Sequence, residues 1–194
     1  MRRIGIAWAA AAACLLASSW SAKAVTAEDI DILTRKIPVA EDGRPLAAAI
    51  PRETVAYTGP YKPGTIIIST PERRMYFVLP GKKAIKYGVG VGRPGFEWSG
   101  VKVISRKQEW PDWTPPEQML KRRPDLPRHM DGGLNNPLGA RAMYLGSSLY
   151  RIHGSNEPQT IGQAVSSGCI RMTNEDVVDL FDRSRIGTKV VVER

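Results

Sequence analysis

Residues 151–172 read RIHGSNEPQTIGQAVSSGCIRM and place His153 sixteen positions before Cys169. The chain of 194 residues has two histidines and two cysteines, so this stretch holds one of each. The sequence LYRIHG predicts a strand that ends at His153, and the small residues SSG before Cys169 predict a turn. The loop between them allows the two side chains to meet, which favours a nucleophile and a base acting together.

The turn at Cys169 provides further parts of an acyl-transfer site. A free thiol has a pKa near ~8.5, and a histidine partner lowers it by several units. Gly168 allows a tight turn in which the amides of Gly168 and Cys169 point at an oxygen that develops negative charge. The alternatives are a structural histidine and an inert buried thiol, and each residue taken alone favours them.

The N-terminus has the pattern of a secretory signal peptide over residues 1–24. Two arginines precede an apolar run from Ile4 to about Ala17, and Ala22-Lys23-Ala24 fits a small-x-small cleavage site. About 14 apolar residues are too few to cross a bilayer, which takes roughly 20. A lipoprotein signal at Cys14 is the alternative, but the large aliphatic residue usual three positions earlier is missing. The sequence therefore predicts export to the periplasm or cell envelope.

Cleavage after Ala24 leaves 170 residues and lowers the formal charge from +9 to +6, because two arginines and one lysine leave. A basic exported protein suits an anionic wall polymer or membrane surface, although a solvated basic surface has the same composition. No basic-aromatic motif indicates a nucleic-acid partner. Cys169 becomes the single cysteine of a secreted chain, where cysteines normally occur in pairs.

The remainder of the chain predicts a mostly β domain with few short helices. We expect an arm or linker over residues 25–62 and one catalytic domain over 63–194. A helix is expected over 173–184, with Thr173 as its cap and Asp176 at the capping-box position. The expected strands are short and rich in β-branched or aromatic residues: 65–70, 75–79, 84–92, 101–107, 141–146, 149–154 and 187–193.

Residues 107–138 form a long insertion rich in proline, with Trp110, Trp113 and a possible short helix in PPEQMLKRR. Connections of this length are usually functional or disordered, and the two tryptophans argue against disorder. We expect a flap or cleft wall, with a purely structural loop as the alternative.

Two other patterns each lack a feature that their site requires. Gly90–Gly95 matches G-x-G-x-x-G, but a turn and a strand follow it instead of the helix that a dinucleotide site requires. A zinc site from His129, His153 and Cys169 has suitable residue types but no closely spaced ligand pair. We expect no metal and no organic cofactor, and place His129 on the surface of the insertion.

The segments IHGSNEP and SSGCIRMTNEDVVDLF resemble the signature of the L,D-transpeptidase catalytic domain, the YkuD or ErfK/YbiS/YcfS/YnhG family. The resemblance extends upstream through GTIIIS, YGVGVGRPGFEWSG, EWPDWTPP and NPLGARAMYLG, so it covers about residues 63–193. It implies a β-sandwich-like fold and cysteine acyl transfer on peptidoglycan stem peptides, in cell wall biogenesis and cell shape.

Carried onto this sequence, the resemblance makes Cys169 the nucleophile and His153 the proton acceptor and donor. The Gly154 carbonyl would orient the imidazole, Gly168 would supply an oxyanion amide, and Arg171 would bind a substrate carboxylate. Ser167 departs from the histidine that many members have there and is expected to support substrate binding.

The same resemblance implies the reaction partners. Acceptors would be a second stem peptide, an envelope-protein lysine or a D-amino acid, and carbapenem-type inhibitors would react with the thiol. Hydrolysis at the same site, an L,D-carboxypeptidase activity, is one alternative. A catalytically silent wall-binding domain is the other.

Overall fold

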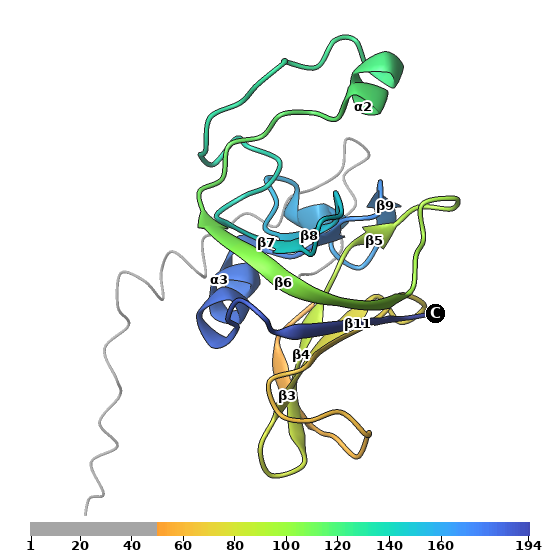
Figure 1. Cartoon of the computed structure of the whole chain (residues 1–194), viewed down its shortest axis with the longest axis vertical. Helices are drawn as coiled ribbons and strands as arrows, with labels where there is room; N and C mark the ends of the chain where they lie inside the picture. The colour runs from red at the N-terminus through yellow and green to blue at the C-terminus, as the bar shows by residue number, and fades with distance from the viewer. Residues whose placement is uncertain (1–49) are drawn as a thin grey trace, which may run out of the picture. The chain divides into compact units, whose positions relative to one another are not determined.

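The computed structural model describes residues 50–194; the expected signal peptide and most of the expected arm lie outside this range. No helix in the described range is long and apolar enough to span a membrane. Strands dominate, as the sequence predicts, and two of them, β5 and β9, form a small separate ladder (Figure 1). The elements in chain order are β1 (Glu53–Ala56), β2 (Ile66–Ser69), β3 (Arg74–Leu79), β4 (Lys83–Gly88), β5 (Val91–Gly92), β6 (Gly100–Glu109), α2 (Glu117–Arg122), β7 (Arg141–Leu145), β8 (Arg151–His153), a 3-10 turn (Pro158–Thr160), β9 (Ala164–Ser166), β10 (Ile170–Arg171), α3 (Asn174–Arg183) and β11 (Lys189–Glu193).

Within residues 50–194, nine strands form one sheet in the order β1-β4-β3-β2-β11-β6-β7-β8-β10. Strand β6 is the corner at which this sheet curls. Its first residues pair with β11 and its later residues with β7, and the register shifts between Ile104 and Arg106. Ser105 lies at this bulge and donates to the carbonyls of Tyr144 and Gly146. A bulge bends and twists a strand, so β6 joins the two halves of the sheet.

The two halves pack their inner faces into one hydrophobic core, which confirms the mostly β, sandwich-like prediction. Alternation along the strands sends apolar side chains inward. The core draws on strands from both sides of β6 and on α3: Ile66, Ile68, Met75, Tyr87, Val89, Ile104, Met143, Leu145, Ile152, Ile170, Met172, Val177, Leu180, Val190 and Val192.

Helix α3 occupies the predicted segment and is fixed at both ends. Thr173 Oγ1 accepts the backbone N–H of Asp176, which is the predicted cap. At the other end, Lys107 Nζ from β6 donates to the carbonyls of Phe181 and Ser184. A cation there also suits the helix dipole. Because α3 directly follows β10, these contacts hold the chain on which Cys169 lies.

The end of the expected arm is part of the folded domain. Strand β1 pairs antiparallel with β4 at the edge of the sheet, and Arg52 forms ion pairs with Asp176 and Asp179 of α3. Tyr61 Oη donates to Glu193. Residues 52–61 therefore already pair with and contact the catalytic domain, although we expected that domain to start at position 63.

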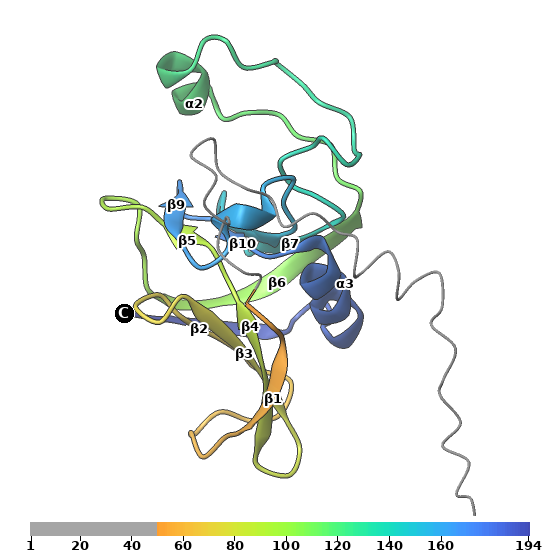
Figure 2. The ribbon, with the colours of Figure 1, turned by 180° about the vertical axis from the view of Figure 1, so that it is seen from behind.

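The long insertion leaves the end of β6 and returns at β7, with α2 at its far end (Figures 1 and 2). Trp113 and Met130 exchange two backbone hydrogen bonds of 2.8 Å, which close the insertion into a loop. Trp113 is buried, whereas Trp110 is 43% exposed. The short helix expected in PPEQMLKRR is confirmed as α2.

Candidate active site

Strands β8 and β10 bring the predicted catalytic residues together. They pair in parallel, with Ile170 opposite Ile152 and Arg171 opposite His153. Successive side chains of a strand point to opposite faces. The isoleucines enter the core, so Arg151 and His153 share the opposite face with Cys169 and Arg171. Parallel pairing of two strands so close in sequence needs a long connection, which residues 154–169 provide.

The turn before Cys169 is held by side chains. Gly168 has φ +104°, and an added Cβ would lie 2.5 Å from Tyr150 Cε1, so only glycine fits. Ser166 Oγ donates to the Cys169 carbonyl at 2.6 Å and accepts the Gly168 N–H at 3.1 Å. The Gly168 amide, which we expected to be free for an oxyanion, is therefore engaged by Ser166.

An aromatic pair supports the same turn from the outside. Trp98 Nε1 donates to the Gly168 carbonyl at 2.7 Å, and the indole stacks on Tyr150 with ring centroids 4.6 Å apart. No peptide bond in the described chain is cis. In a trans peptide the N–H points opposite to the carbonyl. The Cys169 amide therefore points away from Trp98.

The His153 ring is buried and oriented by its own backbone. Nδ1 donates to the Gly154 carbonyl at 2.6 Å. Since a carbonyl only accepts, this bond assigns the proton to Nδ1 and leaves the Nε2 lone pair free. Gly154 is also sterically required, because an added Cβ would lie 2.3 Å from Asn174 Oδ1. That oxygen in turn accepts the Ala140 N–H at 2.9 Å.

The electrostatics describe a neutral resting pair. Burial lowers the pKa of His153 to about 3, with the charge of Arg171 acting in the same direction. Burial also raises the pKa of Cys169, against the opposing charge of Arg151. The expectation that the histidine lowers the thiol pKa is wrong for the resting state, because desolvation penalises both charged forms. A thiol acting as nucleophile here would therefore have to pass its proton to the imidazole as it attacks.

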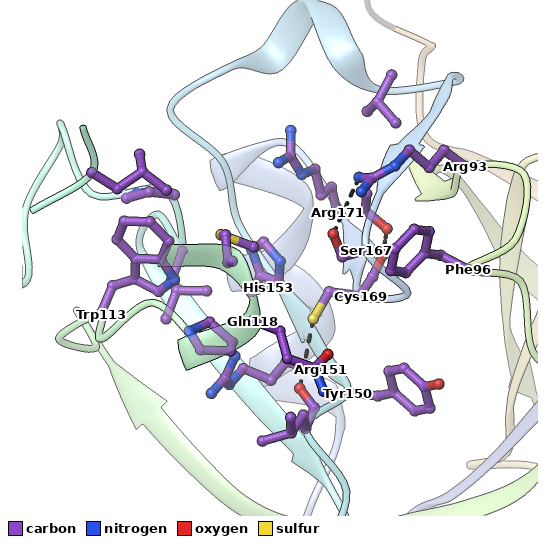
Figure 3. A pocket seen from close by; sticks show the side chains of 18 of the residues that line it. Arg93, Phe96, Trp113, Gln118, Tyr150, Arg151, His153, Ser167, Cys169 and Arg171 are labelled. Atoms are coloured by element: carbon purple, nitrogen blue, oxygen red, sulfur yellow. Dashed lines mark hydrogen bonds between the residues drawn. The ribbon is translucent and has the colours of Figure 1, made fainter. Parts of the chain in front are cut away.

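The thiol and the imidazole face one cleft of about 780 Å³ (Figure 3). No hydrogen bond joins them in the described structure; the half-buried thiol lies 3.7 Å from the Leu149 carbonyl. Catalytic hydrogen bonds in apo sites are often long, so this separation is compatible with catalysis. The opposite wall comes from the insertion, through Trp113 and residues of α2, which agrees with the expected cleft wall.

The expected substrate contacts Ser167 and Arg171 also line the cleft, and His129 lies on the surface as expected. Ser167 Oγ accepts from Arg93 at 3.1 Å, and Arg171 pairs with Glu157 at 2.8 Å. His129 is exposed on the insertion beside Asp131 and does not line the cleft. Within residues 50–194, no group of three or more His, Cys, Asp or Glu side chains is arranged to hold a metal ion.

Sequence reasoning missed several residues of the site, among them Arg151, Arg93 and Trp98. Arg151 precedes His153 by two positions, so strand alternation predicts that both face the cleft. Arg93 lies inside the glycine motif Gly90–Gly95. That motif indicates only a turn between strands, so it gives no sign of a site residue. Nothing in the sequence indicates that Trp98 would reach the Gly168 carbonyl, 70 positions away.

Comparison with known families identifies the domain. The model of the YkuD L,D-transpeptidase catalytic domain matches residues 63–192. The chain belongs to this family. An Escherichia coli protein named probable L,D-transpeptidase ErfK/SrfK is 38% identical to this chain over 134 residues. That match covers 66% of this chain and 43% of the relative, so the chain spans less than half of that protein.

Solved structures share the YkuD fold. L,D-transpeptidase 3 of Mycobacterium tuberculosis, in complex with a faropenem-derived adduct, has a TM-score of 0.54 and 16% identity, covering 67% of this chain and 60% of that one. A Brucella melitensis protein named a probable carnitine operon oxidoreductase is 46% identical with a TM-score of 0.51, covering 76% and 96%. In this chain, Gly90–Gly95 lies in a bridge, strand β5 and a turn, which is not the dinucleotide-binding arrangement.

Proposed function

We propose that this chain is an exported peptidoglycan L,D-transpeptidase with Cys169 as nucleophile and His153 as base and acid. The observation that carries the proposal is the shared cleft of these two residues, in which the Gly154 carbonyl fixes the imidazole tautomer and leaves Nε2 free. Membership of the YkuD family supports the same reaction. The proposed substrate is the stem tetrapeptide, cut between its diamino acid, meso-diaminopimelate in our proposal, and the terminal D-Ala.

In the acylation step, the thiol proton moves to His153 Nε2 while Sγ attacks the carbonyl carbon of the diamino acid. The tetrahedral intermediate carries negative charge on its oxygen. The carbon–nitrogen bond then breaks, and the imidazolium returns the proton to the leaving D-Ala amine. Burial of His153 favours this return, because the low pKa makes the imidazolium a strong acid.

The Cys169 amide is the proposed oxyanion donor. The Trp98 hydrogen bond to the Gly168 carbonyl supports this role by fixing the peptide plane. The Gly168 amide would have to share its proton between Ser166 Oγ and the oxyanion, so we assign it the smaller part. Ser167 and Arg171 remain the proposed substrate contacts from the sequence.

In the second step, an amine attacks the thioester, His153 removes its proton, and the thiol is regenerated. A second stem peptide, an envelope-protein lysine or a D-amino acid supplies the amine. Trp113 and α2 cover one side of the cleft, and we propose that they favour transfer over hydrolysis by limiting the access of water. The reaction as written needs no cofactor. We propose the periplasm or cell envelope as its location, on the signal pattern of residues 1–24.

Incubation of the mature protein with purified disaccharide-tetrapeptide tests this function. We expect release of D-Ala together with a cross-linked dimer, or an exchanged product when a D-amino acid is added. D-Ala release with tripeptide alone would identify an L,D-carboxypeptidase. Absence of D-Ala release, with Cys169 shown to be reduced, would favour a wall-binding domain.

A further inference from the structure

One aromatic ring in the lining of the cleft lies near two arginine side chains. The Arg93 guanidinium lies 4.2 Å from the centroid of the Phe96 ring, and the Arg122 guanidinium lies 5.6 Å from the same centroid. Arg93 and Phe96 belong to the connection between β5 and β6, whereas Arg122 is the last residue of α2 in the insertion. Guanidinium groups from both walls of the cleft therefore lie near one aromatic ring. Arg93, Phe96 and Arg122 all line the cleft.

This arginine pair is attached to the catalytic turn. Arg93 Nη1 donates to Ser167 Oγ at 3.1 Å, two positions before the thiol. Figure 3 shows Arg93, Phe96 and Ser167 on the same side of the Cys169 thiol. A ligand that extends from the thiol along this side of the cleft would therefore meet Arg93.

Positive charge exceeds negative charge in the part of the cleft around Phe96. Two other cleft arginines already have carboxylate partners, Arg171 with Glu157 and Arg123 with Asp125. Among residues 50–194, no carboxylate forms an ion pair with Arg93 or Arg122. Two guanidinium groups beside one ring repel each other, and an anion that contacts both would relieve that repulsion.

We propose that Arg93 and Arg122, ordered by Phe96 and Ser167, bind a carboxylate of the donor stem peptide and so select stems in which that carboxylate is free. This inference rests on the proposed function. A guanidinium matches a carboxylate with two parallel hydrogen bonds, whereas a carboxamide offers one acceptor and no charge. The stem tetrapeptide has three candidate carboxylates, on its D-glutamate, on its diamino-acid side chain and at its D-Ala terminus.

The test measures binding without turnover, in protein that carries Cys169→Ala. Dissociation constants are measured by calorimetry for the tetrapeptide and for three single amides, one at each carboxylate. We expect one amide to bind roughly 10- to 100-fold more weakly than the acid, and its position identifies the carboxylate that is read. Arg93→Gln and Arg122→Gln should weaken the acid by a similar factor and leave that amide unchanged.

Two further variants control for charge and folding. Lys121→Gln removes one positive charge from the same helix, but Lys121 pairs with Glu117 and does not line the cleft, so it should bind as the parent does. Arg93→Lys keeps the positive charge but loses the paired N–H donors of the guanidinium, so it should bind the acid more tightly than Arg93→Gln and more weakly than the parent. Each variant is checked by circular dichroism.

Any of three results would overturn the inference. The arginine variants would weaken the acid and the amides equally, the parent would show no detectable binding of the acid, or all three amides would bind as the acid does. Failure of the proposed function gives a different result: the peptide binds with arginine-dependent affinity, yet the protein with Cys169 intact releases no D-Ala.

Discussion

Trp98 holds the peptide bond that precedes the thiol, because its indole N–H donates to the Gly168 carbonyl at 2.7 Å. The amide of Cys169 belongs to this same peptide plane and points the opposite way. Trp98 does not line the cleft, yet it sets the direction of the proposed oxyanion donor. Stacking on Tyr150 keeps the indole in place.

Trp98→Phe removes this hydrogen bond and keeps an aromatic ring against Tyr150. We expect kcat for D-Ala release to fall about tenfold with little change in KM, less than the 10²–10³ typical of losing a whole oxyanion donor. Trp110→Phe is the matched control, since Trp110 is 43% exposed and outside the cleft lining. An unchanged kcat in Trp98→Phe would show that the turn keeps its geometry without the indole.

Arg151 is predicted to set the ionisation of the thiol. Its charge opposes the burial that raises the pKa of Cys169, and its Nε is buried without a hydrogen-bond partner in the described structure. Arg151→Gln should therefore move the pH midpoint of iodoacetamide alkylation upward. Arg106→Gln is the control, because the Arg106 guanidinium, like that of Arg151, lies over the Tyr144 ring but outside the cleft lining. A midpoint that falls, or that both variants shift equally, would refute the role.

The lowered pKa of His153 predicts that the domain loses stability in mild acid. Its pKa of about 3 in the fold lies below the ordinary 6.5, so between these values the unfolded chain binds a proton that the native state does not. Stability should fall as the pH falls through that window, by about 1.5 kcal/mol from pH 6.5 to 5. Urea unfolding of the wild type and of His153→Gln measures the difference, and the variant should lack this part of the slope. Parallel slopes would mean that His153 binds its proton equally well in the native and unfolded states, against the lowered pKa.

Gly154→Ala should destabilise the domain by about 1–3 kcal/mol, because the new methyl group meets Asn174 Oδ1 at 2.3 Å. The strain falls on the residue whose carbonyl orients His153, so activity should drop as well. Gly133→Ala provides the comparison, since nothing lies within 4 Å of a Cβ built there. Denaturant unfolding and D-Ala release measure both effects. Equal stabilities for the two variants would place Asn174 further from Gly154.

The sequence predicted those parts of the fold that depend on local pattern. The strand that ends at His153, the helix capped by Thr173 and the turn at Gly168 each have local signals: β-branched residues, a capping position and a glycine. Strand β1 was missed because its four residues, ETVA, are mostly exposed at a sheet edge and show no apolar alternation. The bulge at Ser105 was missed because the register between β6, β11 and β7 decides it.

The site was predictable in its residues but not in its electrostatics. His153 and Cys169 follow from their types and spacing. Their neutral resting state follows from burial, which depends on segments far away in the sequence. The same limit applies to Ser166, whose hydroxyl engages the Gly168 amide, and to Trp98.

The central claim is that Cys169 forms an acyl-enzyme with the help of His153, and intact-mass spectrometry with imipenem tests it most directly. The mature protein should gain one drug mass, mapped to the peptide containing SSGCIR. Cys169→Ala should gain none, and His153→Ala should react far more slowly. Absence of an adduct on reduced Cys169, or an equal adduct on Cys169→Ala, would contradict the account.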